Sequence, residues 1–389
     1  MFEVCGGLRQ GGNCLPEFGA NCVSLSWRAM VARPHNVKTM KAMCSNLSKR
    51  WAVRLAALGM WACALLAVAC DGSQGGDFNN AGGKPYELVV SVPQEAWVGE
   101  VGDTLRAVLL EPIPMFNQVE PLFDISRITP DALKDVILRH RNLLIVNISP
   151  DVKEATATAQ YDVYARPQII VTLSAPDNRS MVHYLSENRA ELQQLFEITE
   201  RNRAVANDLK YGEKGISKEI ADQFGIRMNI PRGFTIRGRS EDFLWIGNDV
   251  RIATQGLVIY SYPFTGEQDF TLEELIRHRN EFVKRIPGPS DGSYMATEDY
   301  ITPTVVYPKI NGRQWAEMHG FWFVQNDFMG GPFVTYATFD PVQRRVLCVD
   351  CFVYSPKEPK RNLLRQLQHT VWSVEFTDEA KYRRRGSES

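Results

Sequence analysis

Between positions 84 and 214, some segments have the hydrophobic pattern of strands and others have the 3.6-residue period of helices. The two kinds of segment alternate along the chain. Short apolar runs predict strands at 86–92, 122–128, 142–148 and 168–173. We expect one helix at 102–110, another that begins at Thr129, and a long one from about Asn178, where apolar residues recur on one helical face. This order of elements predicts a first α+β domain at 84–214.

Residues 226–376 are predicted to form a second domain. The segments with a strand pattern are 234–239, 243–248, 257–264, 305–310, 314–324, 333–339 and 346–354. A helix is expected at 271–285, which opens with a capping box, and a last helix at 360–374. Apolar residues occupy both faces of 317–324, which indicates a sheet covered on both sides.

The fold class expected is therefore α+β. It comprises two α/β domains, of which the second is an antiparallel sheet covered by helices on both faces. A polar tail follows at 377–389.

Before the first domain lies an apolar, uncharged run at 55–70 that follows Lys49, Arg50 and Arg54. Basic residues, an apolar stretch and small residues before a cysteine are typical of a lipoprotein signal peptide. We expect a signal at 40–69 and Cys70 as the lipid-bearing first residue of the mature protein. The alternative is a transmembrane anchor, but the run is shorter than the ~20 residues of a bilayer span.

The segments on either side of this signal carry little pattern. Residues 70–83 are rich in Gly, Asn and Ser and are expected to form a flexible tether. Residues 1–39 would precede the signal, so we interpret them as an over-long gene model, with a real extension as the alternative.

Charge and cysteine content narrow the function classes. After Cys70, acidic residues outnumber basic ones by 43 to 36, which argues against a nucleic-acid-binding protein. Cys348 and Cys351 form a CxxC pattern inside a predicted strand, where residues three apart point to opposite faces about 10 Å apart. A disulfide needs Cα atoms within about 7 Å, so two buried thiols are predicted. No cofactor or metal motif is present, and neither ligand is expected.

The predicted order of elements in the second domain resembles the αβα sandwich of PsbP, the extrinsic photosystem II subunit, at the level of fold. A more specific resemblance rests on KPYELVVSV, VGDTLRAVL, EPLFDISRI, ARPQIIVT, DFLWI, LVIYSYPF, IPGPSDGSYM, DFMGGPFVTY and FVYSPKEPKRNLLRQL. These segments resemble an uncharacterised lipoprotein family of Bacteroidetes, a domain of unknown function, over essentially the whole mature chain. The resemblance implies a lipid anchor and a cell-envelope location, and it supplies no activity.

One motif raises the hypothesis of a hydrolase. Residues 288–292 match G-x-S-x-G around Ser290, and His319 and Asp327 could serve as base and orienting group. A nucleophile elbow needs a strand before the serine, whereas here a helix precedes it, so a Gly/Pro turn is the preferred interpretation. His319 lies among aromatic residues of a predicted strand, where a hydrogen-bonded core histidine is commoner.

Two further segments are candidates for binding. Asp327, Gly330 and Gly331 join two predicted strands close to Trp322, and they indicate either a ligand-contacting loop or, the preferred interpretation, an unusual hairpin turn.

The other segment is basic. Lys360, Arg361 and Arg365 open the last helix, where cations oppose the helix dipole and would favour an anion. The alternative is that acidic residues elsewhere in the fold, or water, neutralise them.

We expect 286–298, 327–333 and 357–365 to meet in one site of the second domain. The function predicted is a lipid-anchored envelope protein, at the outer membrane facing the periplasm, with a non-catalytic binding or structural role. Its partner would be an envelope protein or a small anionic ligand. The alternative is an envelope hydrolase that uses Ser290 or His319.

Overall fold

The computed structural model describes residues 80–250 and 253–377, which belong to one compact unit. The predicted signal peptide, Cys70, nearly all of the tether and the tail from residue 378 lie outside the described residues. Within the described part of the chain, no helix combines the length and the hydropathy that a membrane span requires.

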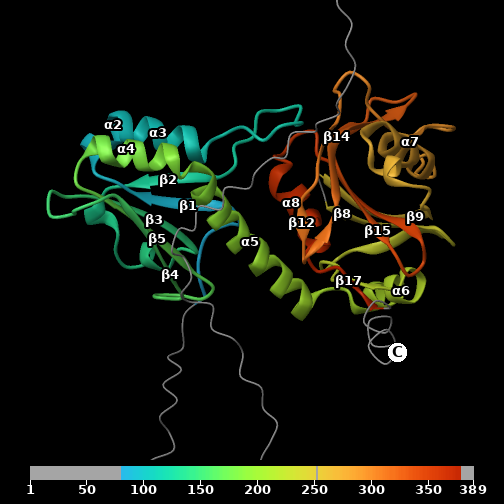
Figure 1. The fold of residues 1–389 in the computed structure, drawn as a ribbon, viewed down its shortest axis with the longest axis horizontal. Coiled ribbons are helices and arrows are strands. Elements are labelled where there is room, and N and C mark those ends of the chain that lie inside the picture. Colours follow the sequence, from blue (N-terminus) through green and yellow to red (C-terminus); the bar gives the residue numbers. More distant parts are fainter. Residues whose placement is uncertain (1–79, 251–252, 378–389) are drawn as a thin grey trace, which may run out of the picture. The chain divides into compact units, whose positions relative to one another are not determined.

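The first domain is a five-stranded sheet in the order β2-β1-β3-β5-β4. Its strands are β1 (Glu87–Ser91), β2 (Asp124–Ile128), β3 (Asn142–Ile148), β4 (Thr156–Tyr161) and β5 (Ile169–Ala175), and only β4 runs antiparallel to its neighbour. The helices are α2 (Gln94–Val98), α3 (Glu100–Leu109), α4 (Asn178–Glu187) and α5 (Arg189–Tyr211). Helices α2, α3 and α4 and the start of α5 share one apolar core with a single face of this sheet (Figure 1).

Three predicted boundaries in this domain are corrected. The helix expected from Thr129 is only a 3-10 turn, Pro130–Ala132. The long helix from Asn178 is two helices separated at Asn188. Helix α3 begins at Glu100, so Gly102 lies inside the helix and does not precede it. A Cβ atom at position 102 would stand 1.8 Å from the carbonyl oxygen of Trp97, so only glycine allows this close approach.

The second domain contains an eight-stranded sheet in the order β10-β14-β15-β16-β9-β8-β7, with β11 also paired to β14. The strands are β7 (Thr235–Ser240), β8 (Phe243–Val250), β9 (Ala253–Pro263), β10 (Tyr294–Thr297), β11 (Thr304–Val306), β14 (Ala316–Gln325), β15 (Gly330–Asp340) and β16 (Arg345–Tyr354). All neighbours in this sheet are antiparallel. Short strands form two further pairs, β12 (Lys309–Ile310) with β13 (Arg313–Gln314), and β6 (Ile226–Arg227) with β17 (Glu375–Phe376).

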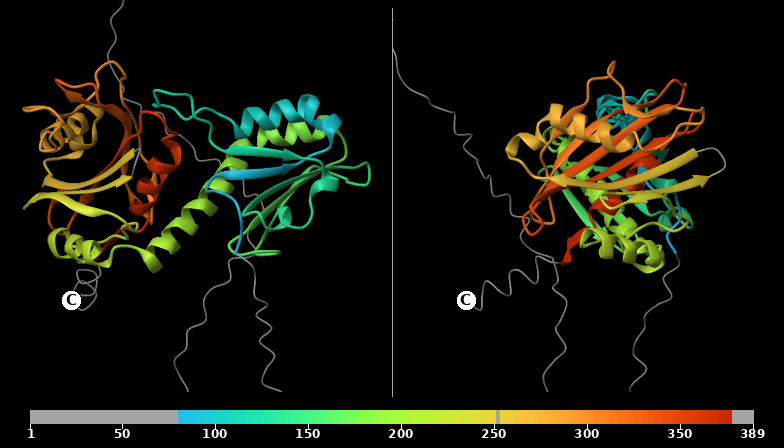
Figure 2. Two further views of the ribbon diagram at one scale, coloured as in Figure 1. Left: turned by 180° about the vertical axis from the view of Figure 1, so that it is seen from behind. Right: turned by 90° about the vertical axis from the view of Figure 1, so that its right-hand side faces the viewer.

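Helices cover both faces of this sheet, which confirms the predicted fold class (Figures 1 and 2). Helices α6 (Lys214–Phe224) and α8 (Arg361–Val371) pack on one face, and α7 (Leu272–Val283) packs on the other. The predicted cap of α7 is confirmed, because the Thr271 hydroxyl accepts a hydrogen bond from the Glu274 amide.

The two cysteines of β16 are free and buried on opposite faces, as predicted. Cys348 packs in the core beneath α7, and Cys351 packs in the core beneath α8.

Helix α7 is fixed to the centre of the sheet by a fully buried ion pair. The Arg279 guanidinium donates to the Asp350 carboxylate at 2.7 Å, and both side chains are 0% exposed. Arg279 also donates to the hydroxyl of Thr297 at 2.9 Å and lies 3.6 Å over the ring of Phe333. The Thr335 hydroxyl donates to Asp350 as well. These partners replace the water that both charges lose, which is the condition for a buried pair to persist.

Candidate functional site

The predicted basic segment does not form an open anion site, because the protein supplies the anion. The backbone amides of Lys360 and Arg361 donate to the carboxylate of Glu120 at 2.8–3.0 Å. Glu120 is buried at the end of the loop between α3 and β2, in the first domain. The Arg361 guanidinium pairs with Asp124 at 2.5 Å. Arg365 likewise pairs with Glu197, whereas the Lys360 ammonium donates to the side-chain oxygen of Gln118 at 3.0 Å. Internal acidic partners, the alternative for this segment, are therefore present for the two arginine side chains.

The three predicted segments also do not share one site. The first two do meet: the Ser290 hydroxyl donates to Asp327 at 2.6 Å, and Pro287, Trp322 and Met329 help to line a groove of about 480 Å³. Residues 357–365 do not line this groove, because the start of α8 packs against the first domain. The prediction of a single composite site is therefore wrong.

The candidate residues near this groove have structural roles. Trp322 is buried, and its indole N–H donates to the carbonyl of Val353 at 3.3 Å. Gly330 and Gly331 begin β15, and a Cβ at Gly331 would stand 2.0 Å from the same carbonyl oxygen. Glycine is needed there for close strand packing. Asp327 is half-buried in the turn that precedes β15.

The residues of the hydrolase hypothesis do not assemble into a nucleophile–base pair. His319 hydrogen-bonds Glu317 at 2.7 Å, whereas the Ser290 hydroxyl is bound to Asp327. Ser290 precedes β10, whose Tyr294 lies opposite Gln325. His319 is six residues from Gln325 along β14, or about 20 Å at the rise of a strand.

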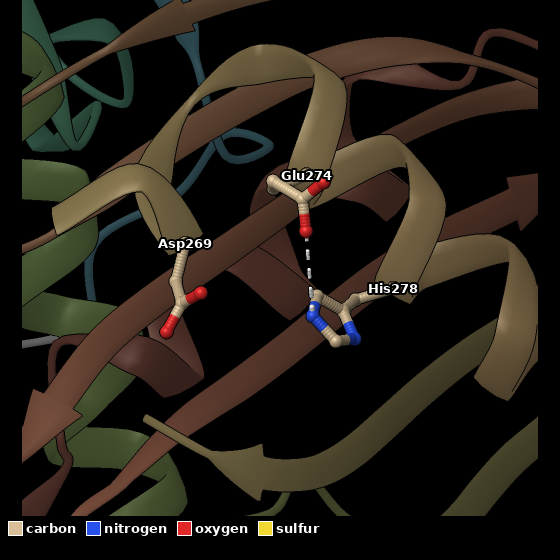
Figure 3. Close-up of side chains that lie close together, drawn as sticks. All are labelled: Asp269, Glu274 and His278. Atoms are coloured by element: carbon tan, nitrogen blue, oxygen red, sulfur yellow. Dashed lines mark ion pairs between the residues drawn. The ribbon is translucent and has the colours of Figure 1, made fainter. Parts of the chain in front are cut away.

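Asp269, Glu274 and His278 lie close together at the start of α7, and each could offer a metal ligand (Figure 3). The Asp269 carboxylate already accepts hydrogen bonds from the amide and hydroxyl of Thr265. The Arg277 guanidinium lies 2.7 Å from Glu274 and 2.6 Å from Nε2 of His278. A fixed positive charge at these atoms opposes a cation, so we interpret the cluster as a hydrogen-bonded helix start.

The strongest candidate site is a cleft of about 570 Å³ between the first domain and helix α8, which we call the interdomain cleft. Its walls come from α5, α8, β14, β15 and the loop between α3 and β2. The apolar lining is Ile113, Phe116, Leu122, Ile198, Pro308, Val334, Leu364 and Trp372, and the polar lining is Tyr86, Gln194, Glu197, Arg201, Glu317, His319, Tyr336, Arg361, Arg365, Gln368 and His369. A cavity of this size that combines an apolar wall with convergent polar groups is typical of small-molecule sites.

A buried tyrosine–histidine pair contributes to the wall of the cleft. The Tyr86 hydroxyl is 2.8 Å from Nε2 of His369, whereas Nδ1 of the same ring is buried and has no hydrogen-bond partner among the described residues. Burial, followed by the charges of Arg365 and Arg201, lowers the pKa of His369 to about 3. The imidazole is therefore neutral at physiological pH.

Two guanidinium groups flank this pair. Arg365 pairs with Glu197 at 2.5 Å, donates to the carbonyl of Leu122 and lies 4.0 Å over the Tyr86 ring. Arg201 stacks on Trp372 at 3.5 Å. No carboxylate of the described residues lies within ion-pair distance of Arg201.

Sequence reasoning found only part of this site. Arg361 and Arg365 were singled out, but Tyr86, Arg201 and His369 were not. One signal was present: Arg361, Arg365 and His369 recur every four residues, which places a polar stripe along one face of the last helix.

Replacement of Glu120 by alanine tests the contact that holds α8. The first amides of α8 lose their buried acceptor, so Glu120→Ala should lower the free energy of unfolding by about 1–2 kcal/mol and speed amide exchange in the first turn of α8. Asp177→Ala is the matched control, because Asp177 accepts from the Ser180 amide and caps α4 inside the first domain. Unchanged exchange in α8 of Glu120→Ala would contradict this role.

The buried His369 predicts a specific loss of stability in acid. An unfolded histidine titrates near pH 6.5, so between pH 6.5 and 3 the unfolded chain binds a proton that the folded chain does not. The stabilisation should thus be fully present above pH 6.5. Below pH 6.5 the free energy of unfolding should decrease by up to about 1.4 kcal/mol per pH unit. Urea unfolding at several pH values across this range measures how the free energy of unfolding changes with pH. This change should be smaller for His369→Gln than for wild type, and equal to wild type for His183→Gln, an exposed control. The same dependence of the unfolding free energy on pH in His369→Gln and wild type would refute the prediction.

Comparisons with known proteins find two family models that match separate parts of the chain. Residues 81–207 match a family model described as a domain of unknown function (DUF8532), and residues 213–373 match another (DUF4837). No curated protein matches the chain. The Ran-binding protein Mog1p of Saccharomyces cerevisiae is 11% identical over 40% of this chain and 92% of its own, with a TM-score of 0.27. A mutant of Mog1 is 11% identical over 41% and 94%, with a TM-score of 0.26. Over both domains, the chain is thus similar to families without an assigned function.

Proposed function

We propose that this chain is a lipid-anchored cell-envelope protein that binds a small molecule in the interdomain cleft without transforming it. The observation that carries the proposal is the cleft itself, which combines an apolar wall with the polar groups of Tyr86, Arg201 and His369. Such a combination can hold the body of a small molecule and orient its polar group.

The protonation states of the histidine and tyrosines in the wall of the cleft support binding over catalysis. A general acid or base works best with a pKa near the operating pH. The pKa of His369 lies far below neutrality, and burial raises the pKa of Tyr86 and of Tyr336 well above the usual tyrosine value. None of these three groups is set to exchange a proton at pH 7. The alternative function, hydrolysis by Ser290 or His319, has no assembled nucleophile and base to support it.

The envelope location is proposed from the sequence. The apolar run at 55–70 with its preceding basic residues, and the resemblance to Bacteroidetes lipoproteins, support a mature chain that begins at Cys70. We place it at the outer membrane, facing the periplasm, where a membrane or a second envelope protein could also be a partner.

Intact-mass analysis of protein from its native membranes tests the anchor. The wild-type chain should begin at Cys70 and carry diacylglycerol and an amide-linked acyl chain, because stable attachment needs more than one acyl chain. Cys70→Ala should carry no lipid. A wild-type chain that retains residues 1–69, or that lacks lipid, would refute the anchor.

A variant with an obstructed cleft tests the binding function. Ile198 lies on α5, lines the cleft and is 40% exposed, so Ile198→Trp should fill part of the cavity with little strain on the core. Val98→Trp is the control, because Val98 is 67% exposed on α2 and does not line the cleft. Mass spectrometry of extracts should find a small molecule with wild type and Val98→Trp that is lost from Ile198→Trp. Identical extracts from all three proteins would contradict the proposal.

A further inference from the structure

Arg201 lines the interdomain cleft without a carboxylate within ion-pair distance among the described residues. The two other guanidinium groups of the lining have such a partner, since Arg365 pairs with Glu197 and Arg361 with Asp124. Glu200 is engaged with Arg141 and Arg203. Glu197 attracts Arg201 as well as Arg365, but no carboxylate of the described residues contacts the Arg201 guanidinium.

The other charged groups that line the cleft each have a hydrogen-bonded partner. Arg361 is bound to Asp124, and Glu317 is hydrogen-bonded to His319 on the strand side. An incoming cation would meet the field of Arg201 without a free carboxylate to receive it. With a neutral ligand, the N–H groups of Arg201 would be hydrogen-bonded only by water.

The way Arg201 is held leaves its hydrogen-bonding edge available. Its guanidinium lies flat against the Trp372 ring at 3.5 Å, and no hydrogen bond from its N–H groups to a described residue is present. Stacking covers the face of the planar group, while the five N–H donors point outward in its plane. This edge matches the two oxygens of a carboxylate, which a guanidinium can bind through two parallel hydrogen bonds.

The remaining wall of the cleft is apolar. Ile198 lies one turn before Arg201 on α5, and Phe116 and Leu122 come from the loop between α3 and β2. A single guanidinium without a contacting carboxylate beside such a wall favours a monoanion with an apolar body over a multiply charged phosphate, whose further charges would be desolvated without partners.

We propose that the ligand of the interdomain cleft is a small organic monocarboxylate, whose carboxylate binds the edge of Arg201 and whose apolar body packs against Ile198, Phe116 and Leu122. This inference rests on the proposed binding function and names its ligand class. Arg201 is then the residue that selects for charge.

Calorimetric titration of the full chain with 2-naphthoate and 2-naphthamide tests the assignment. The two probes share one apolar body and differ in charge. A charge-assisted, two-point contact should give wild type an affinity for naphthoate about 10- to 100-fold higher than for naphthamide. Arg201→Gln should lose most of this preference by weakening naphthoate alone, and Arg201→Lys should retain part of it. Lys210→Gln removes a charge from an exposed position further along α5 and should behave as wild type.

The outcomes separate the ligand class from the binding function. Equal affinities for the two probes, no naphthoate binding, or a preference that survives Arg201→Gln would overturn the carboxylate assignment. If naphthamide binds equally well and Ile198→Trp abolishes its binding, the cleft is still a ligand site and only the charge class fails. If Ile198→Trp binds both probes as wild type does, the probes bind elsewhere and both proposals fail. Urea unfolding of each variant checks that the fold is intact.

Discussion

The carboxylate of Glu120 at the N-terminus of α8 is the contact on which the interdomain cleft depends. A helix N-terminus carries a partial positive charge and unpaired amides, and a buried carboxylate needs donors. Each therefore supplies what the other lacks, in a place from which water is excluded. Because this contact fixes the start of α8, it also fixes Arg365 and His369, one and two turns further on, against Tyr86 and Glu197 of the first domain.

The eight-stranded sheet on which α8 packs is held in place from its other face, where α7 lies. Asp350 in β16 holds Arg279 of α7, while its neighbours Val349 and Cys351 face the core beneath α8. A buried ion pair contributes little net stability, but the loss of one partner would leave a charge in an apolar core. The pair therefore acts mainly as a constraint on where α7 and β16 lie, and through β16 on the paired strand β15, which lines the cleft.

The elements that could be predicted from the sequence are those in which the residues of the element itself show a hydrophobic pattern. The runs that form β1, β3 and β5 and the alternation in β14 were recognisable because each strand buries an apolar face. Strand β4 (TATAQY) was missed because it lies at a sheet edge with small, half-exposed side chains.

The site was harder to predict, because its chemistry depends on pairings across the chain. Glu120 lies 240 residues before Lys360, and Tyr86 lies 283 residues before His369. The position of Arg361 and Arg365 at the start of the last helix marked them as unusual. No local pattern indicates which distant carboxylate neutralises a basic residue and which guanidinium remains without one.

The span between Glu120 and α8 also has a consequence for biogenesis. Both sheets can pair most of their strands before α8 has been synthesised, since α8 follows every strand of the two large sheets. The cleft cannot exist at that stage, because its walls run from Tyr86 to Trp372. A nascent or C-terminally truncated chain would thus have partly assembled domains and no binding site. Under the proposed function, a ligand could be bound only after α8 has been synthesised and has packed against the first domain.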